Sequence, residues 1–330
     1  ASFIEDLNAD SLDIVEMVQP EPTLMATQPS EETLQGYLDA SPDGINAEWA
    51  WGQVAGTATN VTIAVIDSGF DTAHGDLDRA SMPGVVIPHE APWASHHGLQ
   101  VLGILAADDD GQGIRGIAHD SGLHTVNSGR SSGEVANAID LASAALGPGD
   151  VITISQGICA VTGCVGDVVL PLVYSSSARD ALRVVAASGV ITVVSGGNGG
   201  ANLNSYSSRL GTDAPDSIVV GAGNPPPVSD CVMEDGPSRG RVSSSNYGSR
   251  VDLQGWGACV RTTLQGGGYK WWGFTSAATP IVAGSAALVS SMAQQRLGRP
   301  LTGSQIRALL VGTGSPQITL GTRGGNIGPL

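Results

Sequence analysis

The chain has 330 residues, 41% of them hydrophobic, so it can bury a sizeable core and is not disordered throughout. Fifteen lysines and arginines against 31 aspartates and glutamates give a formal net charge of −16, which repels phosphate backbones and argues against a nucleic-acid partner. No uninterrupted apolar stretch approaches the ~20 residues of a membrane-spanning helix, so we expect no membrane partner.

The first 43 residues differ in composition from the rest of the chain. Residues 1–20 hold a short amphipathic segment, and residues 20–43 are rich in Pro, Thr, Ser and Glu, which is typical of an exposed linker. Glu5 and Asp6 stand where a signal peptide would be basic, so we expect any export signal to lie upstream. The sequence therefore predicts a leading segment over residues 1–43 and a folded domain over residues 44–330.

Strands and helices alternate after this leading segment. Dense apolar, β-branched runs predict strands at residues 61–66, 151–154, 190–194 and 218–220. The spacing of apolar and small residues predicts helices at residues 97–107, 177–188, 276–297 and 302–311. Strands that are apolar throughout and separated by helices indicate an α/β protein with a parallel sheet covered on both faces.

Three of these strands end in a polar or glycine-rich turn. Asp67 follows the first strand, residues 155–157 (Ser-Gln-Gly) follow the second, and the glycine cluster at residues 196–200 follows the third. Binding sites in an open parallel sheet lie outside the carboxyl ends of the strands. We therefore expect these turns to face one cleft.

The chain has four cysteines, Cys159, Cys164, Cys231 and Cys259, which fit two disulfides and an oxidising compartment. They allow three pairings, of which we predict Cys159–Cys164 and Cys231–Cys259. None of the gaps has the two-residue spacing of a zinc knuckle. Four reduced, buried thiols are the alternative.

Asp67, His97 and Ser276 are the residue types of a nucleophilic hydrolase. Taken singly, each has an ordinary structural explanation: a turn residue, a helix cap and a small residue at a helix start. Together they supply a hydroxyl nucleophile, a base that takes its proton, and a carboxylate that orients the base. Asn198, which lies between glycines, and the backbone N–H of Ser276 can donate to the oxyanion that forms when a hydroxyl attacks a carbonyl.

The residues around these positions resemble the motifs of the subtilases, the subtilisin-like serine proteases. The matching stretches are residues 61–69 for the aspartate, 97–98 for the histidine, 196–199 for the asparagine and 275–284 for the serine. They occur in the family's order, Asp, His, Ser, and the match runs from about residue 44 to about residue 312.

The resemblance implies a three-layer αβα fold with a mostly parallel central sheet. The predicted disulfides indicate export, to the extracellular space or the periplasm. The resemblance also implies that the enzyme's own propeptide acts as inhibitor and chaperone. Residues 1–43 are accordingly interpreted as a propeptide remnant and linker. Residues 7–20 also look like a helix of an acyl carrier protein, which is the alternative for this segment.

The resemblance further implies which residues bind a polypeptide substrate. Subtilases pair an extended peptide with two edge segments, and glycines form the other wall of the pocket for the residue before the cut. The matching edge segments are residues 128–130, which include Ser128 and Gly129, and residues 155–157, which are Ser155, Gln156 and Gly157. Gly196 and Gly197 match the other wall. Two positions depart from the usual pattern, because Gln156 replaces an apolar residue and Phe274 replaces a glycine.

Subtilases need no cofactor for their chemistry, but they often bind structural calcium. The resemblance places a calcium ligand at Asp76, and the acidic turn at residues 108–113 offers further oxygen atoms without the spacing of an EF-hand. A solvated acidic loop explains that turn equally well.

We therefore expect a secreted serine endopeptidase that hydrolyses peptide bonds through Asp67, His97, Ser276 and Asn198. One alternative is a protein of the same fold that transfers peptides to an amine, as a ligase or macrocyclase. The other is a pseudoprotease that only binds peptides.

Overall fold

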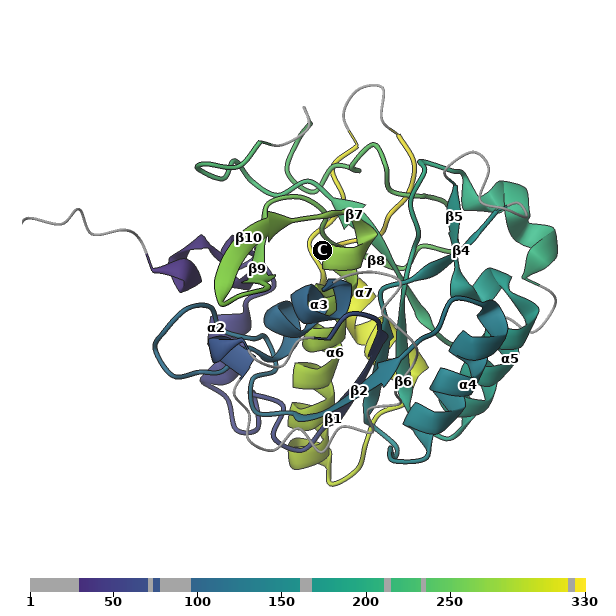
Figure 1. Ribbon diagram of the computed structural model, residues 1–330, viewed down its shortest axis with the longest axis horizontal. Coiled ribbons are helices and arrows are strands. Elements are labelled where there is room, and N and C mark those ends of the chain that lie inside the picture. Colours follow the sequence, from purple (N-terminus) through teal and green to yellow (C-terminus); the bar gives the residue numbers. More distant parts are fainter. Residues whose placement is uncertain are drawn as a thin grey trace, which may run out of the picture.

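The structure, a computed structural model, describes residues 30–70, 74–77, 96–160, 168–210, 215–232, 236–319 and 324–330. Its centre is a six-stranded parallel sheet in the order β2-β1-β3-β6-β7-β8 (Figure 1). The strands are β1 (Thr62–Asp67), β2 (Gly122–Asn127), β3 (Val151–Ile154), β6 (Ile191–Ser195), β7 (Ile218–Gly223) and β8 (Leu253–Trp256).

Helices cover both faces of this sheet. Alternate residues of β1 point to opposite faces, so Ile63 and Val65 join one buried cluster while Ala64 and Ile66 join the other. The first cluster packs against α3 (His97–Ala106) and α6 (Phe274–Leu297), and the second against α4 (Ser132–Ser143) and α5 (Ser176–Ala187). This confirms the expected α/β fold, with three αβα layers around a parallel sheet.

The longest helix, α6, runs through the first of these buried clusters. By length and composition it could cross a membrane, but 78% of its most apolar window is buried inside the protein. Its small residues allow close approach, since a Cβ added at Gly284 would lie 2.6 Å from the side chain of Ile117. We therefore assign α6 to the core of the domain. The described residues also form two shorter helices, α2 (Ala47–Trp51) and α7 (Gly303–Thr313).

Several elements have no counterpart among the sequence predictions. They include β2, β8 and α4, together with two antiparallel hairpins and five short 3-10 segments. The hairpins pair β4 (Gly157–Cys159) with β5 (Val169–Pro171), and β9 (Val260–Leu264) with β10 (Gly268–Trp272). The 3-10 segments are η1 (Glu31–Leu34), η2 (Gly36–Leu38), η3 (Gly75–Leu77), η4 (Leu172–Tyr174) and η5 (Leu203–Arg209).

Residues 30–43 are not the exposed linker that their composition predicts. The side chain of Tyr37 is fully buried, its hydroxyl donates to the carbonyl of Arg261 at 3.1 Å, and Gln35 Nε2 donates to that hydroxyl at 2.6 Å. The indole of Trp256 donates to the carbonyl of Asp43 at 2.8 Å. One buried aromatic ring and its polar partners thus fix this segment to the domain. Residues 1–29 lie outside the described residues.

A disulfide joins Cys231 to Cys259, which is the longer pair expected from the sequence. Cys159 is also disulfide-bonded. Its predicted partner, Cys164, lies outside the described residues.

Candidate active site

The candidate site lies at the carboxyl edge of the parallel sheet. Strands β1, β3 and β6 are neighbours in the sheet, and they end at Asp67, just before Ser155, and just before Gly196. The structure therefore brings together the three turns that the sequence predicts to face one cleft.

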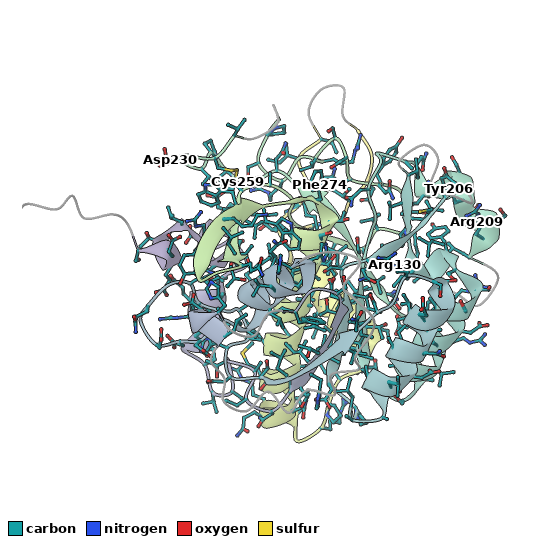
Figure 2. All side chains as sticks on the ribbon, viewed as in Figure 1. Arg130, Tyr206, Arg209, Asp230, Cys259 and Phe274 are labelled. Atoms are coloured by element: carbon teal, nitrogen blue, oxygen red, sulfur yellow. A yellow bond between two sulfur atoms is a disulfide. The ribbon has the colours of Figure 1, made fainter. Side chains whose placement is uncertain are left out.

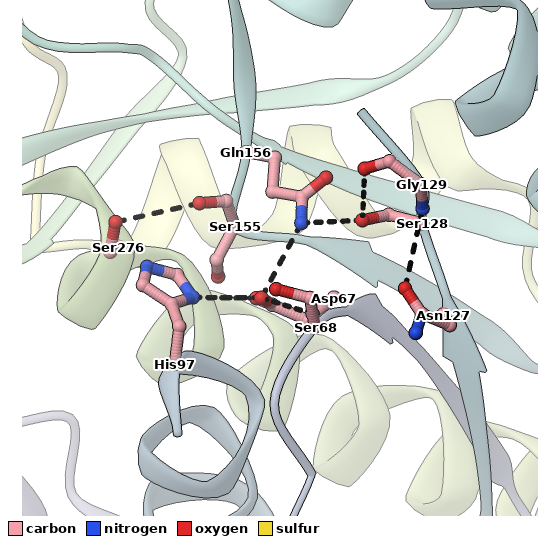
Figure 3. Close-up of polar contacts among 9 residues, drawn as sticks. All are labelled: Asp67, Ser68, His97, Asn127, Ser128, Gly129, Ser155, Gln156 and Ser276. Atoms are coloured by element: carbon pink, nitrogen blue, oxygen red, sulfur yellow. Dashed lines mark hydrogen bonds and ion pairs between the residues drawn. The ribbon is translucent and has the colours of Figure 1, made fainter. Parts of the chain in front are cut away.

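Asp67 and His97 form a close pair (Figure 3). Asp67 is fully buried at the end of β1, and its two carboxylate oxygens lie 2.8 Å and 2.9 Å from Nδ1 of His97. His97 is the first residue of α3, and the start of this helix is fixed because Gly98 N–H donates to the carbonyl of Ser68 at 2.7 Å. A Cβ on Gly98 would lie 2.6 Å from the ring of Phe70, so the position suits glycine. Because an ionised carboxylate only accepts hydrogen bonds, Nδ1 carries the proton and Nε2 is the free base.

Opposing influences act on the pKa of His97. Burial lowers it, but the negative charge of Asp67 and its hydrogen bond to Nδ1 raise it, and the net pKa lies above the ordinary value of 6.5. Trp272, the last residue of β10, packs edge-on against the imidazole, with ring centroids 5.0 Å apart. The imidazole is thus held on one side by a carboxylate and on another by an aromatic ring.

Ser276 lies in the first turn of α6, on the other side of the imidazole from Asp67 (Figure 3). Its hydroxyl donates to the carbonyl of Ser155 at 3.4 Å, and the described residues include no hydrogen bond between Ser276 and His97. Catalytic hydrogen bonds are commonly long in the absence of substrate. The backbone N–H groups in the first turn of a helix have no acceptor within the helix, so that of Ser276 is available to a ligand.

The side chain of Asn198 is oriented by Thr275. The hydroxyl of Thr275 donates to Asn198 Oδ1 at 2.9 Å and in turn accepts from the hydroxyl of Ser195 at 2.8 Å. With Oδ1 occupied, the NH₂ group remains as the donor of Asn198. The preceding residue, Gly197, has φ of +77°, and a Cβ there would lie 2.0 Å from the carbonyl oxygen of Val169, so the loop requires glycine.

A cleft of about 1310 Å³ contains these groups. Its walls include His97, Asn198 and Ser276. Of the predicted substrate-binding residues, those that line the cleft are Gly129, Ser155, Gln156 and Gly157. The other three do not line it within the described part of the chain: Ser128 lies behind Gln156, and Gly196 and Gly197 shape the loop that carries Asn198.

Gln156 connects one wall of the cleft to the aspartate. Its Nε2 donates to Ser128 Oγ at 2.6 Å and reaches Asp67 Oδ1 at 3.4 Å (Figure 3). The side chain is buried, so an apolar residue at this position would leave Asp67 without this donor.

Asp76, which the resemblance assigns to a calcium site, is held by two hydrogen-bond donors. Its Oδ2 accepts from the N–H of Ile114 at 2.8 Å, and its Oδ1 accepts from the hydroxyl of Tyr269 at 2.8 Å. Burial and the hydrogen bond to Asp76 raise the pKa of Tyr269, so the phenol keeps the proton that it donates. Each oxygen thus has one hydrogen-bond donor, and no group of three or more His, Cys, Asp or Glu side chains that could hold a metal occurs among the described residues. Structural calcium at Asp76 stays a prediction.

Sequence reasoning does not assign site roles to several residues that the structure places here. Trp272, Thr275 and Arg209 contact the proposed catalytic side chains or line the cleft. Thr275 lies inside the serine motif and so had a local signal. Arg130, which the sequence places in the edge segment of residues 128–130, also lines the cleft. Arg209 and Trp272 reach the site only through the tertiary fold.

An αβα protein with an Asp–His pair and a serine in one cleft belongs to the structural class of the serine hydrolases. The subtilase family model matches residues 58–326, and the chain therefore belongs to the subtilase family.

Two curated relatives are similar to most of the domain. Subtilisin NAT from Bacillus subtilis subsp. natto and subtilisin from Bacillus pumilus are each 32% identical over 242 residues, or 71% of this chain. The aligned part covers 56% of the first relative and 78% of the second, so the chain spans little more than half the length of subtilisin NAT.

A solved structure shares the fold. It is a protease from Pseudoalteromonas arctica with a TM-score of 0.65 and 22% identity, aligned over 86% of this chain and 91% of the other.

Proposed function

We propose that this chain is an exported serine endopeptidase in which Ser276 is the nucleophile, His97 the general base and Asp67 the residue that orients it. The observation that carries the proposal is the arrangement of one cleft. His97 is bonded through Nδ1 to a buried carboxylate, its other ring nitrogen faces Ser276, and the amide of Asn198 lies in the same cavity (Figure 3).

The steps follow from the atoms in the cleft. Ser276 Oγ attacks the peptide carbonyl carbon while His97 Nε2 takes its proton. Asn198 and the backbone N–H of Ser276 donate to the oxyanion. When the C–N bond breaks, the imidazolium gives its proton to the leaving amine, and an acyl-enzyme remains on Ser276. Water then attacks the ester by the same route, and Asp67 stays ionised throughout. No step needs a cofactor.

The family match and the disulfide support the other parts of the proposal. Subtilases act on polypeptides, and the bond between Cys231 and Cys259 is typical of an oxidising compartment, extracellular or periplasmic. We retain a propeptide partner on the basis of the sequence. The packing of residues 30–43 supports moving the start of the catalytic domain from residue 44 to about residue 30. A structural calcium ion bound at Asp76 remains part of the proposal on the basis of the sequence resemblance alone.

Fluorophosphonate labelling and peptide hydrolysis test the proposal. Ser276→Ala is expected to abolish labelling and to lower kcat by roughly a million-fold, as loss of the serine does in a subtilisin. His97→Ala should have a similar effect. The matched control is His96→Asn, because His96 has φ of +63° and asparagine tolerates that conformation, so this variant should keep full activity.

The outcomes separate the alternatives. A wild-type chain that binds peptides but neither labels nor hydrolyses them is a pseudoprotease. A chain that labels but gives mainly the aminolysis product when an amine competes with water is a ligase. Loss of activity in the His96 variant alone would show that the base is misassigned.

A further inference from the structure

The charged side chains that line the cleft in the described part of the chain are cationic. Among the described residues, the cleft contains Arg130, Arg209 and the titratable His97, and no aspartate or glutamate. This contrasts with the whole chain, whose 31 acidic and 15 basic residues give −16. A random sample of this surface would place about two acids beside each base, so the composition of the cleft indicates what it binds.

Arg209, the last residue of η5, is held in place by neutral groups of the described residues. One of its Nη atoms donates to the carbonyl of Ala160 at 2.8 Å, and its guanidinium lies 5.9 Å from the ring centre of Tyr206. A guanidinium has five N–H donors, so most of them remain for a ligand. No carboxylate of the described residues forms an ion pair with it.

Arg209 and the proposed nucleophile, Ser276, contact the same segment of the chain. The segment of residues 155–160 begins at the carbonyl that accepts the Ser276 hydroxyl, includes β4, and ends at the carbonyl that accepts from Arg209. One continuous wall of the cleft therefore has the serine at one end and a guanidinium at the other.

Arg130 lies on the opposite edge segment, beside Gly129, and its side chain is exposed. The nearest acidic residue along the chain is Glu134. Its carboxylate accepts hydrogen bonds from the backbone N–H groups of Arg130 and Ser131 and from the Ser131 hydroxyl. No ion pair between Glu134 and the Arg130 guanidinium is present within the described part of the chain. Figure 2 shows Arg130 near the middle of the molecule, with Phe274 on one side and Arg209 on the other.

We propose that the cleft selects peptides with acidic side chains on the acyl side of the cut. Arg209 binds the carboxylate of the residue directly before the cut, and Arg130 binds an acidic residue further upstream. The proposal rests on the proposed function, since the acyl side is defined by attack of Ser276. The family match indicates polypeptide substrates in general, and this proposal narrows them to peptides with acidic side chains before the cut.

Because the rest of the molecule is acidic, any preference for acidic peptides depends on these two arginines. The net charge of −16 disfavours the approach of acidic peptides, so only cations inside the cleft can favour them. We expect kcat/KM for a peptide with Glu before the cut to exceed that of the matched Gln peptide by roughly fivefold to thirtyfold at low salt. Added salt should reduce this ratio.

Paired peptides that differ only by Glu or Gln before the cut test the proposal. Arg209→Gln should bring the Glu/Gln ratio of kcat/KM to one or below for the residue directly before the cut. Arg130→Gln should bring that ratio to one or below for a Glu/Gln pair further upstream. The matched control is Arg299→Gln, which removes the same charge outside the cleft and should leave both ratios unchanged.

Binding of the same peptides to Ser276→Ala separates this proposal from the proposed function. If the wild-type chain labels and hydrolyses peptides but the Glu/Gln ratio is one, the acid preference is wrong and the protease assignment stands. If nothing is hydrolysed, tighter binding of the Glu peptide by Ser276→Ala, lost in the Arg209 variant, still supports the acid preference. Equal binding of both peptides, or binding of neither, overturns it.

Discussion

The carboxylate of Asp67 is surrounded by three donors. It accepts from Nδ1 of His97, from the N–H of Ser68 at 2.7 Å and, at 3.4 Å, from Nε2 of Gln156. Each donor stabilises the negative charge of the carboxylate. Each of the other two donors therefore weakens the attraction between Asp67 and the imidazolium of His97. The strength of Asp67 as a partner of His97 is therefore set in part by a glutamine in the wall of the cleft.

Replacing Gln156 by leucine should move the acid limb of activity to higher pH. The active form has neutral His97, so activity is lost as the pH falls through the pKa of His97, which already lies above its ordinary value. Without the amide, Asp67 holds the imidazolium more tightly, and the limb should rise by about 0.3–0.5 pH unit. The measurement is kcat/KM between pH 5 and pH 9.

Ser128→Ala is the control for this variant, because it removes the other partner of Gln156 and leaves the contact with Asp67. It should shift the limb less than Gln156→Leu does. A limb that moves to lower pH in the leucine variant would mean that Gln156 acts only through the packing of the cleft wall.

The proposed catalytic residues are predictable from the sequence because each lies in a local motif, directly after a strand or at the start of a helix. Their supporting contacts are not predictable in this way. Trp272 reaches His97 from a hairpin about 175 residues later in the chain, and only the tertiary fold brings the two rings together.

The backbone is strained at the first residue of α6. This residue, Phe274, has φ of +64° and is 54% exposed, and its N–H donates to the carbonyl of Gly257 at 2.7 Å. A positive φ at a residue with a Cβ costs about 1–2 kcal/mol. This strain lies two residues from the proposed nucleophile, at the position where the family usually has glycine.

The variants Phe274→Gly and Phe274→Ala measure this strain, because both lack the ring and only alanine has a Cβ. We expect the glycine variant to be more stable than the alanine variant by about 1 kcal/mol, since the general penalty of glycine in the unfolded state partly offsets the relief. The measurement is the urea midpoint in a Ser276→Ala background, which prevents self-digestion. Equal midpoints would show that the turn relaxes without strain.

The strands that the sequence predicts are buried runs rich in β-branched residues. The runs of β1, β3 and β6 are almost wholly buried because helices cover both faces of the sheet. Strand β8 is equally buried, but its sequence, Leu-Gln-Gly-Trp, has no β-branched residue to mark it. The hairpin β9–β10 and strand β2 mix polar and apolar residues and are partly exposed, so their pattern does not stand out. Helix α4 did carry a signal, the capping box of Ser131 and Glu134.

Residues 30–43 pack against the strands that precede α6 in the sequence. Besides the contacts of Tyr37 and Asp43, Arg261 on β9 pairs with Glu31, and Arg115 N–H donates to Gln35 Oε1 at 2.7 Å. Composition predicts a linker here because Pro, Ser and Glu outnumber the few apolar residues. Burial of one aromatic ring, that of Tyr37, is enough to attach this segment to the domain despite its polar composition.

Tyr37→Ala should destabilise the fold by about 3–5 kcal/mol, the range for loss of a large buried aromatic ring. Tyr37→Phe should cost only about 1 kcal/mol, because it keeps the ring and removes the hydroxyl that bonds Arg261. Urea unfolding in the Ser276→Ala background gives both values. A loss below 1 kcal/mol for alanine would mean that this segment is attached to the domain without stabilising it.

The distance along the chain between contacting residues affects how the protein is made. Tyr37 and Arg261 are 224 residues apart in sequence, and the hydroxyl of Ser276 bonds a carbonyl 121 residues earlier. A ribosome adds about 5–20 residues per second, so these groups are synthesised many seconds apart. The growing chain therefore carries Asp67 and His97 long before it carries Ser276. Under the proposed function, it gains the ability to cut peptides only after α6 has been synthesised.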